Sequence, residues 1–298
     1  MEQNRTLLPA LPKEYKKVKW KAPFLFAHDK LCMELFCLTD KLGINVPIDS
    51  VYGGIPCSWD TNNIPSEISS SYSDIRNSIE TYNRRNVSCC FTFNNYDVNE
   101  KMFYDELPNK ILKAASEFDV DNYAIIASDA LYQYIKDNYP KIKLISSVIR
   151  PYNQNILKTK EVKYYDDLCE KYDRVVIRAE LNFDDRFLKK LKYKKKIEII
   201  VNNNCVLGCK LRQFHYRVMT KKRISLCNKA REDINFVYNN TFLSKNDIIR
   251  IQKMGFEHFK LDGRGLDNKE LFNNVIARYI FEPTGIIQPL SFFFETIH

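Results

Sequence analysis

The sequence contains no long apolar run. No stretch approaches the roughly 20 consecutive apolar residues that a membrane-spanning helix needs, and residues 1–17 are polar, without the apolar core of a signal peptide. We therefore expect no membrane span and a cytoplasmic location. Glycine and proline are also scarce, with 8 and 11 among 298 residues, while 45% of the residues are hydrophobic. This composition excludes collagen-like, mucin-like and disordered chains.

Glycine-rich phosphate loops are missing as well. Neither the G-x-G-x-x-G turn of dinucleotide-binding sheets nor the G-x-x-x-x-G-K turn of P-loop proteins occurs. Such a turn usually follows the first strand of an open, doubly wound sheet. Its absence disfavours that fold, which is the main alternative for a chain whose β-rich runs alternate with helical patterns.

The alternation favours an α/β fold, namely a (β/α)8 TIM-like barrel. Eight runs have the composition and length of strands, and a helical pattern follows each of them. The predicted strands are 23–27, 48–53, 87–94, 122–127, 142–148, 174–179, 197–202 and 258–262. We expect an N-terminal extension at 1–21, the barrel at 22–280 and a C-terminal tail at 281–298. Because the tail carries three consecutive phenylalanines from Phe292, it is a candidate surface for forming a homo- or hetero-oligomer.

The longest insertion without helical or strand periodicity, 203–243, follows the seventh predicted strand. It contains Cys205 and Cys209, whose spacing lets two thiolates reach one metal, and it also contains His215 and Cys227. Cys57 follows the second strand, so barrel closure would bring it to the same face. Nine cysteines in a reducing compartment favour metal binding or buried thiols over disulfides. We expect the four cysteines to form one metal site, with His215 as a substitute ligand; the alternative is that they are ordinary thiols.

Polar residues at the ends of other strands are further candidates. Glu180 and Asp262 could act as general acid or base, and a second set could bind substrate. That second set is Asn94, Asn182, Arg212, Lys260 and Arg264. Lys and Arg exceed Asp and Glu by 46 to 37, and basic and aromatic residues mix around Arg212, which suits an anionic small molecule or RNA as substrate. Each residue also has a plainer interpretation as a loop residue, and Asp262 with Arg264 could simply form an ion pair.

Three segments together resemble the peptidase U32-like barrel proteins. They are 51–54 with Cys57, then 201–216 with its cysteine pair, and finally 255–264, which reads GFEHFKLDGR. The resemblance implies a TIM-like barrel. For members that serve oxygen-independent ubiquinone synthesis or RNA hydroxylation, it also implies a four-cysteine [4Fe–4S] site. Cys57 matches a ligand position of those members, whereas the close pair here precedes the isolated Cys227 instead of following a lone cysteine.

The leading hypothesis is a U32-like enzyme with a cysteine-ligated metal centre, [4Fe–4S] or zinc, that modifies a biosynthetic intermediate or RNA. Peptidase activity is not favoured, because no arrangement of nucleophile and base is visible. Two alternatives stay open. One is an accessory or assembly protein with structural cysteines, and the other is a metal-free barrel enzyme that acts on a sugar or nucleotide-sugar through Glu180 and Asp262.

Overall fold

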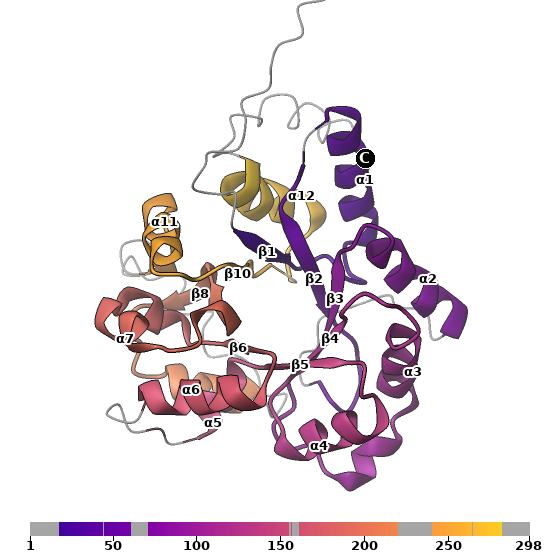
Figure 1. Ribbon diagram of the computed structural model, residues 1–298, viewed down its shortest axis with the longest axis horizontal. Helices are drawn as coiled ribbons and strands as arrows, with labels where there is room; N and C mark the ends of the chain where they lie inside the picture. Colours follow the sequence, from indigo (N-terminus) through magenta and orange to yellow (C-terminus); the bar gives the residue numbers. More distant parts are fainter. Residues whose placement is uncertain are drawn as a thin grey trace, which may run out of the picture.

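The computed structural model describes residues 18–43, 45–60, 71–154, 156, 161–219, 240–263 and 265–281. In these ranges, eight parallel strands close into a barrel in the order β1-β10-β7-β6-β5-β4-β3-β2 (Figure 1). The strands are β1 (Lys19–Ala22), β2 (Ile48–Gly54), β3 (Ser88–Phe93), β4 (Tyr123–Ile126), β5 (Lys143–Ser146), β6 (Arg174–Val176), β7 (Ile197–Ile200) and β10 (His258–Lys260). The predicted (β/α)8 barrel is therefore confirmed.

Helices follow the strands and cover the outside of the barrel (Figure 1). They are α1 (Asp29–Lys41), α2 (Tyr72–Asn83), α3 (Glu106–Ala115), α4 (Asp129–Asn138), α6 (Glu161–Lys171), α7 (Asp185–Lys190), α11 (Lys245–Lys253) and α12 (Asn268–Leu271), which continues as the π-helical segment η6 (Phe272–Phe281). Several begin at a side-chain cap. Ser244, for example, accepts a hydrogen bond from the amide of Asp247, whose carboxylate accepts one from the amide of Ser244. No described helix is long and apolar enough to cross a membrane.

The first predicted strand, 23–27, is wrong. Residues 23–27 form a turn, and β1 lies just before them, so the barrel begins within the expected N-terminal extension. The first strand was predicted at the wrong residues because Lys21, a charged residue that is only 3% exposed, interrupts the apolar pattern of β1. The turn presses on β2 at Gly53, where a Cβ atom would lie 2.1 Å from the carbonyl oxygen of Leu25. A glycine is therefore required at this contact.

The insertion after the seventh barrel strand also contains regular structure that the sequence pattern did not predict. Strand β8 (Asn202–Val206) pairs antiparallel with β9 (Asn240–Phe242), outside the barrel sheet. Helix α8 (Arg212–Met219) follows β8 and packs against α5 (Ile149–Asn153), the short helix after β5. The loops after β5 and β7, two strands that are separated in the barrel by β6, are thus in contact with each other.

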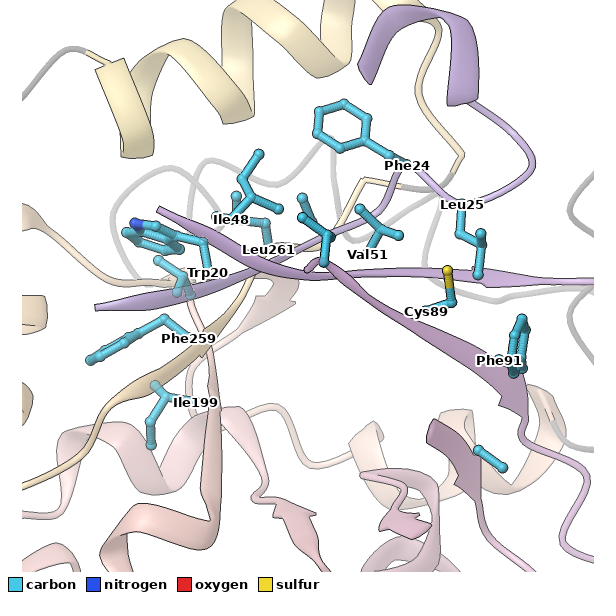
Figure 2. Packing of buried hydrophobic residues seen from close by; sticks show 14 of the residues in the cluster. Trp20, Phe24, Leu25, Ile48, Val51, Cys89, Phe91, Ile199, Phe259 and Leu261 are labelled. Atoms are coloured by element: carbon cyan, nitrogen blue, oxygen red, sulfur yellow. The ribbon is translucent and has the colours of Figure 1, made fainter. Parts of the chain in front are cut away.

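The buried apolar residues form three clusters, of which one consists of Ala127, Ile149, Tyr152 and Tyr216 and the other two belong to the barrel wall and interior. The larger one lies between the outer face of the barrel and the helices, and Figure 2 shows some of its side chains, among them Trp20, Val51 and Phe259. The smaller one lies inside the barrel and consists of Tyr52, Cys90, Tyr123, Ile125, Ile145, Val176 and Ile200. Successive strand residues point to opposite faces, which explains why neighbours such as Val51 and Tyr52 belong to different parts.

Charged side chains share the barrel interior with these apolar residues. Lys21 and Glu198 form an ion pair, and both are nearly inaccessible to solvent. Arg174 lies 3.7 Å from the same Glu198 oxygen. Burial opposes ionisation of Glu198, but the charges of Lys21 and Arg174 outweigh it and lower its pKa to about 2. This interior ion group replaces part of the apolar packing that usually fills such a barrel.

Candidate functional site

The loops that follow the eight barrel strands lie at one end of the barrel, which we call the barrel mouth. All neighbouring barrel strands are parallel, so their carboxyl ends share this end. Cys57 follows β2 and Cys205 lies on β8, directly after β7. Both cysteines therefore come after the carboxyl end of a strand of the closed parallel barrel.

Two predicted site residues meet at the mouth. Glu180, in the 3₁₀ segment η4 (Ala179–Phe183) after β6, forms an ion pair with a terminal nitrogen of Arg212 from α8. The other terminal nitrogen of Arg212 donates to the carbonyl oxygen of Val206 at 2.6 Å, and its Nε donates to Cys205 Sγ at 3.3 Å. Arg212 is 4% exposed. Its guanidinium is thus engaged by protein acceptors on three sides, and its expected role in binding a substrate anion stays a prediction.

Glu180 is itself held by several donors. Its Oε2 accepts a hydrogen bond of 2.8 Å from Tyr152, and Arg178 Nε lies 3.6 Å from Oε1. Burial raises the pKa of Tyr152 well above its usual value, and neighbouring Tyr216 and Glu180 raise it further, so the phenol stays protonated and donates. Within this arrangement Glu180 serves to hold Arg212.

Tyr152 and Tyr216 were not predicted as site residues. Their rings stack with centroids 4.1 Å apart and planes 9° from parallel, and this stack lies between α5 and α8. Asn203 donates to the Tyr216 hydroxyl at 3.1 Å. The spacing of Arg212 and Tyr216, four residues apart, would place both on one face of a helix and is the signal that the sequence offered.

Lys260 is the last residue of β10, the last barrel strand, and Asp262 lies two residues after it. Asp262 is half-buried, and its backbone is bound in both directions by the side-chain amide of Asn202, at 2.6 Å for each bond. The Asp262 carboxylate accepts from the amide of Gly263 at 3.1 Å. Lys260 is also half-buried, and its Nζ lies 4.1 Å from the centre of the Tyr52 ring. Arg264 lies outside the described residues.

Asn94 and Asn182 connect strands within the mouth. Asn94 accepts a hydrogen bond of 2.6 Å from Ser147, which joins the ends of β3 and β5. Asn182 is fully buried and donates to the carbonyl oxygen of Ile200 at 2.9 Å, which joins η4 to β7. Since both side chains are buried and bonded to the protein, their observed contacts are structural.

The cysteines occupy different surroundings. Cys57 packs against the larger apolar core. Its pKa is raised to about 12, mainly by burial, with Asp60 and Asp105 adding to the increase. Cys209 is half-buried in the turn after β8, and its amide donates to the carbonyl oxygen of Val206 at 3.2 Å. All eight described cysteines are free thiols.

The expected four-cysteine site is not assembled by the described residues. They contain no group of three or more His, Cys, Asp or Glu side chains that could hold a metal ion. Cys57, which packs against the apolar core, therefore does not complete a three-ligand group with Cys205 and Cys209. The two thiols of the β8 turn remain suited to a soft metal, and their expected partners, Cys227 and the side chain of His215, lie outside the described residues.

Comparison with known proteins supports the fold. No family model matches the chain, and no curated protein matches it. The solved structure of the U32 peptidase Mk0906 matches 83% of this chain and 92% of that chain, with a TM-score of 0.50 and 9% sequence identity. At this identity the likeness concerns the fold alone. The chain therefore has the barrel fold of a U32 peptidase, as its sequence motifs indicated.

Proposed function

We propose that the chain is a U32-like barrel enzyme that modifies an anionic substrate, a biosynthetic intermediate or RNA, at a cysteine-ligated metal centre in the barrel mouth. One observation carries this proposal. Cys205 Sγ lies at the mouth and accepts a hydrogen bond of 3.3 Å from Nε of Arg212, whereas the other buried cysteines that the structure describes belong to the apolar core clusters. A cysteine sulfur at the barrel mouth is a soft donor of the kind that zinc and iron–sulfur clusters bind.

The proposed ligands are Cys205 and Cys209, with Cys227 or His215 to complete the set. Cysteine thiolates suit an iron–sulfur cluster or zinc, because both prefer soft sulfur ligands. When bound, an iron–sulfur group would supply electron transfer and zinc would supply a Lewis acid. The chain's own part is to hold its thiols at the end of β8, where the Glu180 ion pair fixes α8.

The substrate proposal rests on the remaining charged groups of the mouth. Lys260 is a half-buried cation at the end of β10, and the half-buried carboxylate of Asp262 follows it closely in the chain. Lys260 can attract an anionic group, and Asp262 can accept or deliver a proton. The overall excess of Lys and Arg, 46 against 37 acidic residues, favours the approach of such a substrate.

A metal-free enzyme for sugars is less well supported. That alternative needs Glu180 and Asp262 as a pair of catalytic carboxylates. Glu180 instead forms an ion pair with Arg212 and accepts a hydrogen bond from Tyr152. A carboxylate bound in this way is poorly placed to exchange a proton with substrate.

Purification without oxygen, followed by iron, zinc and acid-labile sulfide analysis, tests the proposal. We expect a stoichiometric metal in the natural protein and a large loss of metal in Cys205→Ala and Cys209→Ala, because a shared centre binds as a unit. Cys169→Ala is the matched control, since Cys169 is a fully buried residue of α6, and this variant should keep its metal. A natural protein without stoichiometric metal, or full metal in Cys205→Ala, would contradict the proposal.

A further inference from the structure

The end of the barrel opposite the mouth carries a dense cluster of lysines. Seven basic residues and no acidic one lie between residues 186 and 196, where α7 ends and the 3₁₀ segment η5 (Lys194–Lys196) leads directly into β7. Because β7 runs parallel to its neighbours, its first residue lies at the amino-terminal end of the barrel. The cluster therefore lies at the end of the barrel that the proposed reaction does not use.

Buried apolar residues fix this segment to the barrel and leave most of its lysines in solvent. Phe187, Leu188 and Leu191 are buried and belong to the larger apolar core. Lys196 is tied to the fold as well, because its ammonium donates to the carbonyl oxygen of Cys169 at 2.7 Å. The exposed lysines of the segment are Lys189, Lys190, Lys192 and Lys195.

The cluster continues onto the start of β1. The ammonium groups of Lys195 and Lys19 lie 3.6 and 3.5 Å from the two carboxylate oxygens of Glu257, the residue before β10. Strands β1, β10 and β7 are neighbours in the barrel, so these lysines share one surface. We call it the basic face, and it consists of Lys19, Lys189, Lys190, Lys192, Lys194 and Lys195.

The contacts of the described residues bring few carboxylates to the basic face. Glu257 is shared by two of its lysines. Asp166 accepts a hydrogen bond of 3.0 Å from the backbone amide of Lys192. Glu170 accepts one of 2.9 Å from the hydroxyl of Tyr193. Six lysines thus lie beside three carboxylates, and the excess of positive charge attracts polyanions.

The residue types of the basic face indicate which kind of polyanion fits it. All six cations are lysines, which act as point charges, whereas arginine supplies the paired N–H groups that bind one phosphate in a fixed geometry. Tyr193, the aromatic residue among these lysines, is half-buried, and the ammonium of Lys192 lies 4.7 Å from the centre of its ring. This ring is therefore not available to stack on a nucleic-acid base. Such a face suits many weak contacts with a broad anionic surface.

We propose that the basic face binds the surface of a bilayer rich in acidic phospholipids, with the barrel mouth directed away from the lipid. No helix in the described part of the chain could cross a bilayer, so this attachment is peripheral and electrostatic. It is therefore weakened by salt, and each lysine near an anionic membrane strengthens binding by about fivefold. The attachment requires nothing of the chemistry at the mouth.

Co-sedimentation with lipid vesicles tests the proposal. The probes are vesicles of phosphatidylcholine alone and vesicles with one-third phosphatidylserine, each in about 0.1 M and about 0.5 M salt. The natural protein should bind the phosphatidylserine vesicles at the lower salt concentration, leave them at the higher one, and not bind phosphatidylcholine. The triple variant Lys189→Glu, Lys190→Glu, Lys192→Glu should bind more than about a hundredfold more weakly.

Three lysines at the mouth end of the barrel provide a matched control. Lys30, Lys101 and Lys269 are exposed and follow the carboxyl ends of β1, β3 and β10. Changing all three to glutamate alters the net charge equally, yet vesicle binding should stay close to that of the natural protein. If the variant of the basic face does not fold, glutamine at the same three positions should weaken binding by about a hundredfold.

Three results would overturn the proposal. The first is that the natural protein does not bind phosphatidylserine vesicles at the lower salt concentration. The second is an equal loss of binding in the two triple glutamate variants, because total charge rather than the basic face would then be responsible. The third is binding of oligouridine through the basic face in preference to vesicles, which would assign this face to nucleic acid. Metal content enters none of these measurements, so they are independent of the proposed function.

Discussion

Acid is expected to destabilise the protein well above the pH at which carboxylates protonate, because of His258 inside the barrel. His258 is 7% exposed, and burial followed by the charge of Arg174 lowers its pKa from 6.5 to about 4. The folded protein thus takes up this proton less readily than the unfolded chain does. The folded protein therefore has its full stability, as far as His258 is concerned, above pH 6.5. This part of the unfolding free energy is lost as the pH falls towards 4. Each unit of difference between the pKa of His258 in the unfolded chain and in the folded protein corresponds to about 1.4 kcal/mol, so the difference amounts to roughly 3 kcal/mol of unfolding free energy.

Urea unfolding at several pH values between 7 and 4 measures this effect. The natural protein should lose most of that free energy over this range, whereas His258→Asn should lose clearly less, because its side chain does not titrate. Below pH 4.5 a second loss is expected in both proteins. It comes from Glu198, whose pKa is about 2 in the folded protein and 4.5 in a free chain. Equal pH slopes between pH 7 and 5 for the natural protein and His258→Asn would refute this reasoning.

Three further substitutions test the fold and the site. Gly53→Ala should destabilise the protein by about 3 kcal/mol or more in urea unfolding, because its Cβ would lie 2.1 Å from the Leu25 carbonyl oxygen; an unchanged midpoint would show that the turn lies elsewhere. Lys21→Met should cost about 3 kcal/mol by removing the ion-pair partner of Glu198, which then keeps Arg174 at 3.7 Å; an unchanged urea midpoint would show that the Lys21 ion pair does not stabilise the barrel. Cys57→Ala should leave the metal content unchanged, which elemental analysis checks, and loss of metal would restore Cys57 as a ligand.

The barrel could be predicted from the sequence because most of its strands are short apolar runs separated by helical patterns. The first strand could not, because the charged residue Lys21 interrupts its apolar pattern and forms a buried ion pair with Glu198 of β7. A charged residue indicates a solvent-facing position unless its partner is known, and these two partners are 177 residues apart. Strand β8 was missed for a related reason, since its asparagines do not alternate with apolar residues.

The site was predictable only as far as its position on the barrel. The ends of parallel strands identify which residues lie at the mouth, and this rule placed Glu180 and Cys205 there correctly. It does not say which side chains meet. The pairing of Glu180 with Arg212 depends on α8 packing on α5, and Cys57 packs on the apolar core and joins no three-ligand group of the described residues. Both depend on tertiary contacts that spacing does not encode.

The most direct test of a cysteine-ligated centre at the mouth is anomalous X-ray diffraction at the iron and zinc absorption edges from crystals grown without oxygen. We predict one strong anomalous peak next to the sulfur atoms of Cys205 and Cys209, and its loss in Cys205→Ala. No anomalous peak at the barrel mouth, or a peak at Cys57 without Cys205, would contradict the account.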